Sequence, residues 1–182
     1  MTNQGFSILA LTATLAACGS SSAPPPTSED IVAAHISHLA NAMDSGPLTE
    51  NMPQTGNVAY TGSFGLQVAD DPGKIAVGDA KINVAFGSNL MSGGVDQMYY
   101  ANIDDEGGLT YVQDDPFGTA ITFEGAFNGA EGYLYADGLI DGKTIDGDIS
   151  TAFTGANAEN LVGLGTGDIE GTGVHIFLNT QK

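Results

Sequence analysis

The sequence contains no arginine and no tryptophan, and its single cysteine is Cys18. Four basic residues stand against 22 acidic ones, which gives the 182 residues a formal net charge of -18. This scarcity of cations excludes most nucleic-acid binding, because lysine and arginine are needed to displace counterions from phosphate. It equally disfavours electrostatic docking on anionic lipid headgroups. One cysteine excludes an internal disulfide and a cysteine-based zinc cluster.

The N-terminal segment has the pattern of a targeting sequence. Residues 6–17 form an apolar run that is too short to span a bilayer, which needs roughly 20 residues, but suits the core of a signal peptide. The run ends in Leu-Ala-Ala-Cys at residues 15–18, which resembles the lipobox of bacterial lipoproteins. The resemblance implies cleavage before Cys18 and lipid on its thiol. Gly19, in place of an aspartate after the cysteine, resembles the signal for passage to the outer membrane. A buried N-terminal segment with an incidental free cysteine is the alternative.

Changes of composition divide the chain into four parts. We expect a signal peptide at 1–17, a flexible tether at 18–27, a helical segment at 28–46 and a folded domain at 52–182. The tether is rich in serine, glycine and proline, which keep it flexible and extended. Such a stretch buries nothing, so we expect it to hold the folded domain away from a membrane.

One amphipathic helix is predicted over about residues 28–44. Thr27 precedes it and an acid follows three residues later, which is a capping pattern. Apolar residues then recur at helical spacing: Val32, Ile36, Leu39 and Met43. This apolar face is expected to pack against the domain that follows.

His35 and His38 stand three residues apart on the other side of this helix, close enough to hold one ligand. A metal or haem site is one interpretation, and two solvated polar positions are the other. We favour the solvated positions, because no further ligand stands nearby and the third histidine, His175, is far along the chain. We therefore predict no bound metal and no other cofactor.

From residue 54 onward the hydrophobic period changes to two, which is typical of strands. The expected strands cover 57–68, 78–87, 90–98, 119–127, 130–140, 145–153, 160–169 and 173–180. Short turn signals between them favour an antiparallel meander, and eight such strands close naturally into a barrel. The predicted fold class is all-β: a single soluble antiparallel barrel of about eight strands after a short amphipathic helix. Solubility is expected because a transmembrane barrel needs aromatic girdles that this composition lacks. Seven side chains are expected to be largely buried: Ile82, Val84, Phe86, Phe123, Phe127, Phe153 and Phe177.

Aspartate and glycine crowd the stretch 137–148. Calcium would accept such carboxylates, but their spacing matches neither an EF-hand loop nor the nonapeptide calcium repeat. Asp-Gly is also the favoured dipeptide of a tight hairpin turn. We therefore favour turns over a calcium site.

Three stretches resemble transferrin-binding-protein-B-like barrels. Residues 80–95 look like a strand that ends in an aromatic residue and turns into a Ser-Gly-Gly strand, and residues 52–62 fit the opening strand. Residues 149–163 resemble the closing signature, in which Phe-x-Gly-x-x-Ala-Glu leads to a glycine-bearing strand. The resemblance covers about 52–170. It implies backbone roles for Gly155 and Gly163, while Glu159 either caps backbone amides or is simply solvated.

The sequence carries no recognisable catalytic motif, so we predict that the protein is not an enzyme. The resemblance implies a membrane-anchored binding lipoprotein, held at the outer membrane through lipid on Cys18 and facing either the cell surface or the periplasm. It would capture a protein or a solute, with a TonB-dependent receptor as a candidate partner. A structural envelope lipoprotein without a captured ligand is the alternative. The residues that bind the ligand are not assigned by the sequence.

Overall fold

The structure is a computed structural model that describes residues 24–44 and 46–182. The predicted signal peptide, Cys18 and most of the tether lie outside the described residues. The helices are α1 (Ser28–Ala40) and the 3-10 helix η1 (Asn41–Asp44). The strands are β1 (Asn57–Val68), β2 (Asp71–Ala85), β3 (Leu90–Ile103), β4 (Leu109–Val112), β5 (Phe117–Asn128), β6 (Glu131–Ile140), β7 (Lys143–Thr154), β8 (Asn160–Ile169) and β9 (Thr172–Gln181).

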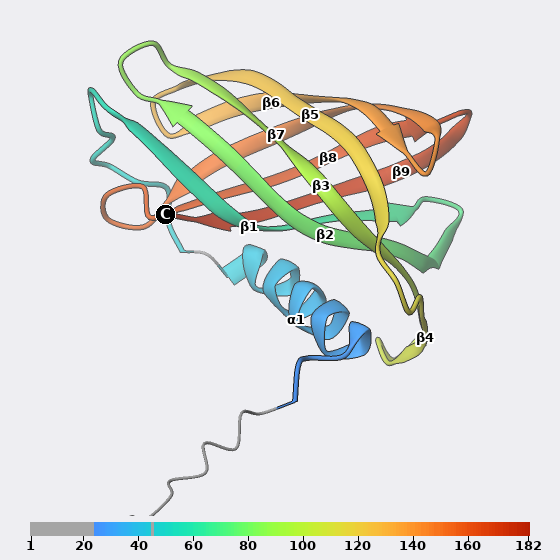
Figure 1. The fold of residues 1–182 in the computed structure, drawn as a ribbon. Coiled ribbons are helices and arrows are strands. Elements are labelled where there is room, and N and C mark those ends of the chain that lie inside the picture. The colour runs from blue at the N-terminus through green and yellow to red at the C-terminus, as the bar shows by residue number, and fades with distance from the viewer. Residues whose placement is uncertain (1–23, 45) are drawn as a thin grey trace, which may run out of the picture.

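Eight of these strands form a closed antiparallel barrel (Figure 1). Their order is β2-β1-β9-β8-β7-β6-β5-β3, and pairing of β2 with β3 closes the sheet. The short strand β4 pairs with the end of β3 as an addition to the barrel. Closure satisfies the edge strands that an open sheet would expose. The predicted all-β barrel of about eight strands after a short helix is therefore confirmed.

Three strands were predicted incompletely or missed, and of these β3 was expected over 90–98 but extends to Ile103. The second strand was expected from residue 78, because Pro72 and Gly73 indicated a turn, but β2 begins at Asp71. The β1–β2 ladder shifts register after Gln67, and the Gln67 side-chain amide donates to the Pro72 carbonyl at 2.8 Å. This irregularity accommodates a proline that lacks an amide hydrogen. Strand β4 was not predicted.

The barrel interior holds the main hydrophobic core. Six of the seven side chains expected to be buried lie within it, but Phe177 is only half-buried. Its neighbours on β9, Ile176 and Leu178, point inward, so alternation places Phe177 on the outer wall. Four aromatic rings pack together inside, with Phe153 at 5.8 Å from Tyr60, 5.9 Å from Phe86 and 5.1 Å from Phe127 between ring centroids.

One end of the barrel is closed by the segment that joins the helices to β1 and by the turn between β7 and β8. The Thr49 amide donates to the Phe153 carbonyl at 3.0 Å, and the Thr49 hydroxyl accepts from the Ala158 amide at 3.2 Å. The Tyr60 hydroxyl donates to the Ala158 carbonyl at 2.6 Å from inside the barrel. Burial, followed by the charge of Glu159, raises the pKa of Tyr60 to about 12, so this hydroxyl stays protonated as a donor.

The helix α1 packs on the outer wall beside β1 and β2 (Figure 1). The predicted capping pattern is present: Thr27 and Asp30 each accept a hydrogen bond from the backbone amide of the other. Val32 is fully buried, and Ile36 and Leu39 pack around it against β2, β3 and β4. The described helices are all too short and too polar to cross a bilayer.

Candidate functional site

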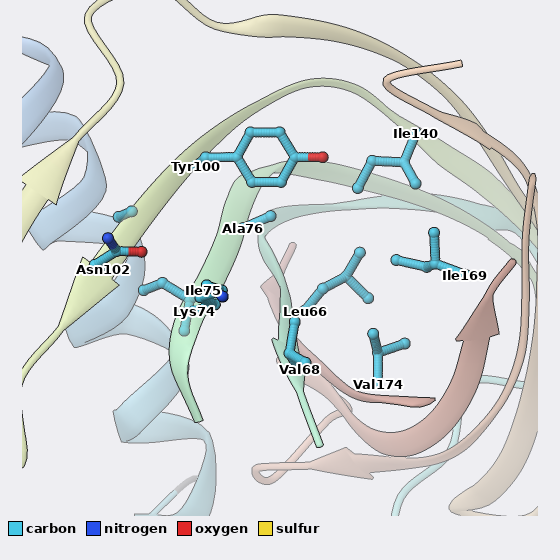
Figure 2. Close-up of a pocket in the computed structure, with 11 residues that line it drawn as sticks. Leu66, Val68, Lys74, Ile75, Ala76, Tyr100, Asn102, Ile140, Ile169 and Val174 are labelled. Atoms are coloured by element: carbon cyan, nitrogen blue, oxygen red, sulfur yellow. The ribbon is translucent and has the colours of Figure 1, made fainter. Parts of the chain in front are cut away.

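An apolar pocket opens at the other end of the barrel, where β1 turns into β2 (Figure 2). The pocket has a volume of about 260 Å³. It is lined mainly by one residue from each of six strands: Leu66, Ala76, Tyr100, Ile140, Ile169 and Val174. This volume lies just below the range of roughly 300–1,000 Å³ that drug-sized ligands occupy. The pocket therefore suits a small apolar molecule.

The pocket exists because a small residue stands between two large ones in neighbouring strands. Ala76 on β2 lies opposite Leu66 on β1 and opposite Tyr100 on β3. The alanine methyl group leaves the space between the leucine and the tyrosine unfilled. Phe117 stacks on the Tyr100 ring at a centroid distance of 4.2 Å, which holds the ring at the edge of the opening.

Polar groups stand only at the rim of this pocket. Burial, followed by the charge of Asp141, raises the pKa of the Tyr100 hydroxyl, so the group is a hydrogen-bond donor at neutral pH. The Lys74 ammonium lies 2.7 Å from an Asp71 carboxylate oxygen, which offsets its charge. Asn102 adds an amide at the same rim. The arrangement can hold an apolar body inside and one neutral polar group at the opening.

The two histidines of α1 do not lie where the sequence analysis placed them. His35 is buried, and the Nδ1 atoms of His35 and His38 lie 2.8 and 3.0 Å from the Ser63 hydroxyl oxygen on β1. One hydroxyl can serve both rings by donating to one nitrogen and accepting from the other. The expectation of solvated positions is wrong for His35, because the face of α1 against the barrel is wider than the apolar stripe alone.

No group of three or more histidine, cysteine or acidic side chains that could hold a metal ion occurs in the described part of the chain. The nearest acid to the histidine pair is Asp79, whose carboxylate lies 4.0 Å from His35 Nε2. Through their contacts with Ser63, His35 and His38 join the helix to the barrel.

Docking of α1 is expected to weaken as the pH falls below 6.5, the ordinary pKa of histidine. Burial lowers the pKa of His35; the nearby Asp79 opposes this shift and His38 adds to it. His35 therefore binds protons more readily when the helix is undocked. Its contribution to docking is complete above the ordinary histidine pKa, and it is lost as the pH falls toward the lowered pKa of docked His35. Hydrogen exchange of the α1 amides between about pH 7.5 and pH 5 measures this.

His35→Gln should remove most of this pH dependence, whereas His175→Gln, which changes an exposed histidine on β9, should retain it. Equal behaviour of the two variants would show that His35 does not control the docking of the helix.

The acidic stretch 137–148 is only partly a turn. Asp141 and Gly142 form the β6–β7 hairpin turn with φ of 49° and 76°, as expected for Asp-Gly. Asp137 lies inside β6, and Asp146 and Asp148 lie inside β7. At these three positions the expected strands 130–140 and 145–153 are confirmed, and the interpretation of the whole run as turns is wrong, because inward-facing Ala136, Ile145 and Ile149 continue the strand alternation.

The signature residues have structural positions. Gly155 adopts φ of 84° in the turn after β7. Glu159 accepts a hydrogen bond from the Asn157 amide at 2.8 Å, which confirms the capping role rather than simple solvation. Burial leaves no room beside Gly163, where an added Cβ would lie 2.7 Å from Ile149. These residues shape the closed end of the barrel and line no part of the pocket.

The fold resembles that of transferrin-binding protein B and of a surface lipoprotein. A mutant of transferrin-binding protein B (TbpB) from Haemophilus parasuis superimposes with a TM-score of 0.54 and 19% sequence identity over 75% of this chain. The chain spans 28% of that protein. A structure described as a surface lipoprotein gives a TM-score of 0.52 and 12% identity, over 75% of this chain and 65% of that one. The resemblance to TbpB-like barrels is confirmed at the level of the fold.

No protein-family model matches this sequence, and neither does any curated protein.

Proposed function

We propose that the protein is a membrane-anchored, non-enzymatic binding lipoprotein that captures a small apolar solute at the cell envelope. Lipid on Cys18 holds it at the outer membrane, and the tether carries the barrel. The observation that carries the proposal is the apolar pocket at the mouth of a barrel that follows a lipobox and a flexible tether. The TbpB-like fold supports a binding role, since transferrin-binding protein B is named for binding transferrin.

The position of α1 fits this arrangement. The Ser28 hydroxyl donates to the Asp114 carbonyl, which lies between β4 and β5 at the pocket end of the barrel. The described end of the tether, residues 24–27, therefore joins α1 at the end of the barrel where the pocket opens (Figure 1). Lipid-derived or other apolar solutes of the envelope would meet the pocket from that side.

A titration with the neutral fluorescent probe N-phenyl-1-naphthylamine tests the pocket. The full chain in mild detergent should enhance the probe's fluorescence saturably, because an apolar cavity removes the probe from water. Ala76→Leu should weaken binding at least about tenfold, since the longer side chain fills the space between Leu66 and Tyr100. Ala59→Leu makes the same change at an exposed position on β1 and should leave binding unchanged.

Unfolding temperatures of both variants show whether the barrel is intact. Mass spectrometry of small molecules that co-purify with the wild-type protein from envelopes then identifies the natural ligand, which Ala76→Leu should lose. A folded protein that binds no probe and carries no small molecule would favour a structural envelope lipoprotein instead.

A further inference from the structure

A second surface, separate from the pocket, lies on the outer wall of the barrel across β2, β3, β5 and β6. It is a shallow groove of about 890 Å³. Large apolar side chains stand exposed along it, with exposed fractions of 54% for Leu90, 62% for Tyr133 and 44% for Tyr135. The helix covers a different part of the wall, beside β1 and β2 (Figure 1). Exposed aromatic side chains concentrated in one groove are typical of interaction surfaces.

The strand register explains the hollow. Ser92 on β3 lies opposite Glu124 on β5, which lies opposite Tyr135 on β6. In the next cross-strand row, Ala126 on β5 stands between Leu90 and Tyr133. The short side chains of Ser92 and Ala126 therefore form a floor, Leu90 and the two tyrosines form the sides, and Glu124 places a carboxylate between Ser92 and Tyr135.

A row of carboxylates lies next to the tyrosines, on β6, β7 and β8. Asp148 on β7 lies directly opposite Tyr135, and Asp137, Asp146 and Asp168 follow one another in register across β6, β7 and β8. Like charges in directly opposed positions destabilise a sheet. Within residues 24–44 and 46–182 none of these carboxylates forms an ion pair with a lysine or histidine.

One lysine lies on the same outer face of the barrel. Lys81 on β2 belongs to the same cross-strand row as Asp137, but β3 and β5 lie between them. The negative charge beside the tyrosines is therefore uncompensated by the chain itself. The pKa of the Tyr135 hydroxyl is raised, first by burial and then by the charges of Asp146, Asp137 and Asp148. The shift follows from the short distance between these carboxylates and the hydroxyl.

We propose that this groove docks a lysine- or arginine-rich segment of a partner protein. Tyrosine faces attract such cations, and neighbouring carboxylates pair with them. Cationic side chains laid along β6 and β7 would also relieve the repulsion between the opposed aspartates. A second copy of this chain does not fit, because each copy carries a net charge of -18 and the copies repel. The surface goes beyond the solute site and depends neither on the pocket nor on its ligand.

Binding of a fluorescein-labelled deca-arginine peptide to the full chain in mild detergent, followed by fluorescence anisotropy, tests this proposal. The double variant Tyr133→Ser, Tyr135→Ser keeps the charge and should weaken binding about tenfold. Glu124→Gln with Asp148→Asn should weaken it about fivefold.

Asp114→Asn with Asp115→Asn is the matched control, since it removes two exposed carboxylates beyond β4, away from the groove. It should change binding less than about twofold. Circular dichroism establishes that all three variants are folded. The proposal is overturned if the peptide does not bind, if the tyrosine variant binds as the wild type does, or if both charge variants weaken binding equally. The last two of these results would leave only a diffuse attraction to the acidic surface.

Discussion

Replacing Cys18 with serine is expected to move the protein from the membrane fraction to the soluble fraction, or to leave it unprocessed with residues 1–17 attached. Each buried methylene contributes about 0.8 kcal/mol, so one acyl chain anchors weakly and two or more anchor stably. The acidic domain adds no attraction to anionic headgroups. Fractionation of cells followed by immunodetection measures the change.

Ser20→Ala is the matched control, because it alters a hydroxyl two residues away in the tether and keeps Cys18. It should remain in the membrane fraction. Retention of Cys18→Ser in the membrane, in processed form, would mean that something other than lipid on this residue holds the protein there.

Phe153→Ala is expected to lower the free energy of unfolding by about 3–5 kcal/mol. The ring is fully buried and contacts Tyr60, Phe86 and Phe127, so its removal leaves a cavity among rings that cannot all collapse into it. Denaturant unfolding followed by circular dichroism gives the value.

Phe177→Ala makes the same chemical change on the outer wall and should lower the free energy of unfolding by only about 1–2 kcal/mol, since its ring is half-exposed. Equal losses for the two variants would contradict the placement of Phe153 inside and Phe177 outside.

The barrel was predictable because its strands alternate and its turns carry local signals. Asp141-Gly142 illustrates this, since the Asp-Gly dipeptide alone predicts a hairpin turn, and both residues adopt positive φ. Similarly, Thr27 and Asp30 indicated the start of α1 before any packing was known. These features depend on neighbours in sequence, and sequence displays them directly.

Features that depend on partners across the barrel were less visible. Asp137-Gly138 resembles Asp141-Gly142 in sequence, yet it lies inside β6, where it pairs with residues 145 and 146 of β7. His35 is buried because the wall beneath α1 offers Ser63 to it. Phe177 is as apolar as Phe153, and only the register of β9 places it outside.

The pocket could not be predicted for the same reason. Ala76 is one alanine among many, and it defines a cavity only because Leu66 and Tyr100 stand opposite it on two different strands. No local pattern marks that position. The outer groove likewise depends on the register that brings Leu90, Ala126 and Tyr133 into one row.

The intact mass of the protein purified from cell envelopes is the most direct test of cleavage before Cys18 and of lipid on its thiol. We expect a chain that begins at Cys18, with the mass of residues 18–182 increased by lipid equivalent to roughly two or three acyl chains. A mature envelope form that retains residues 1–17 and carries an unmodified thiol at Cys18 would contradict it.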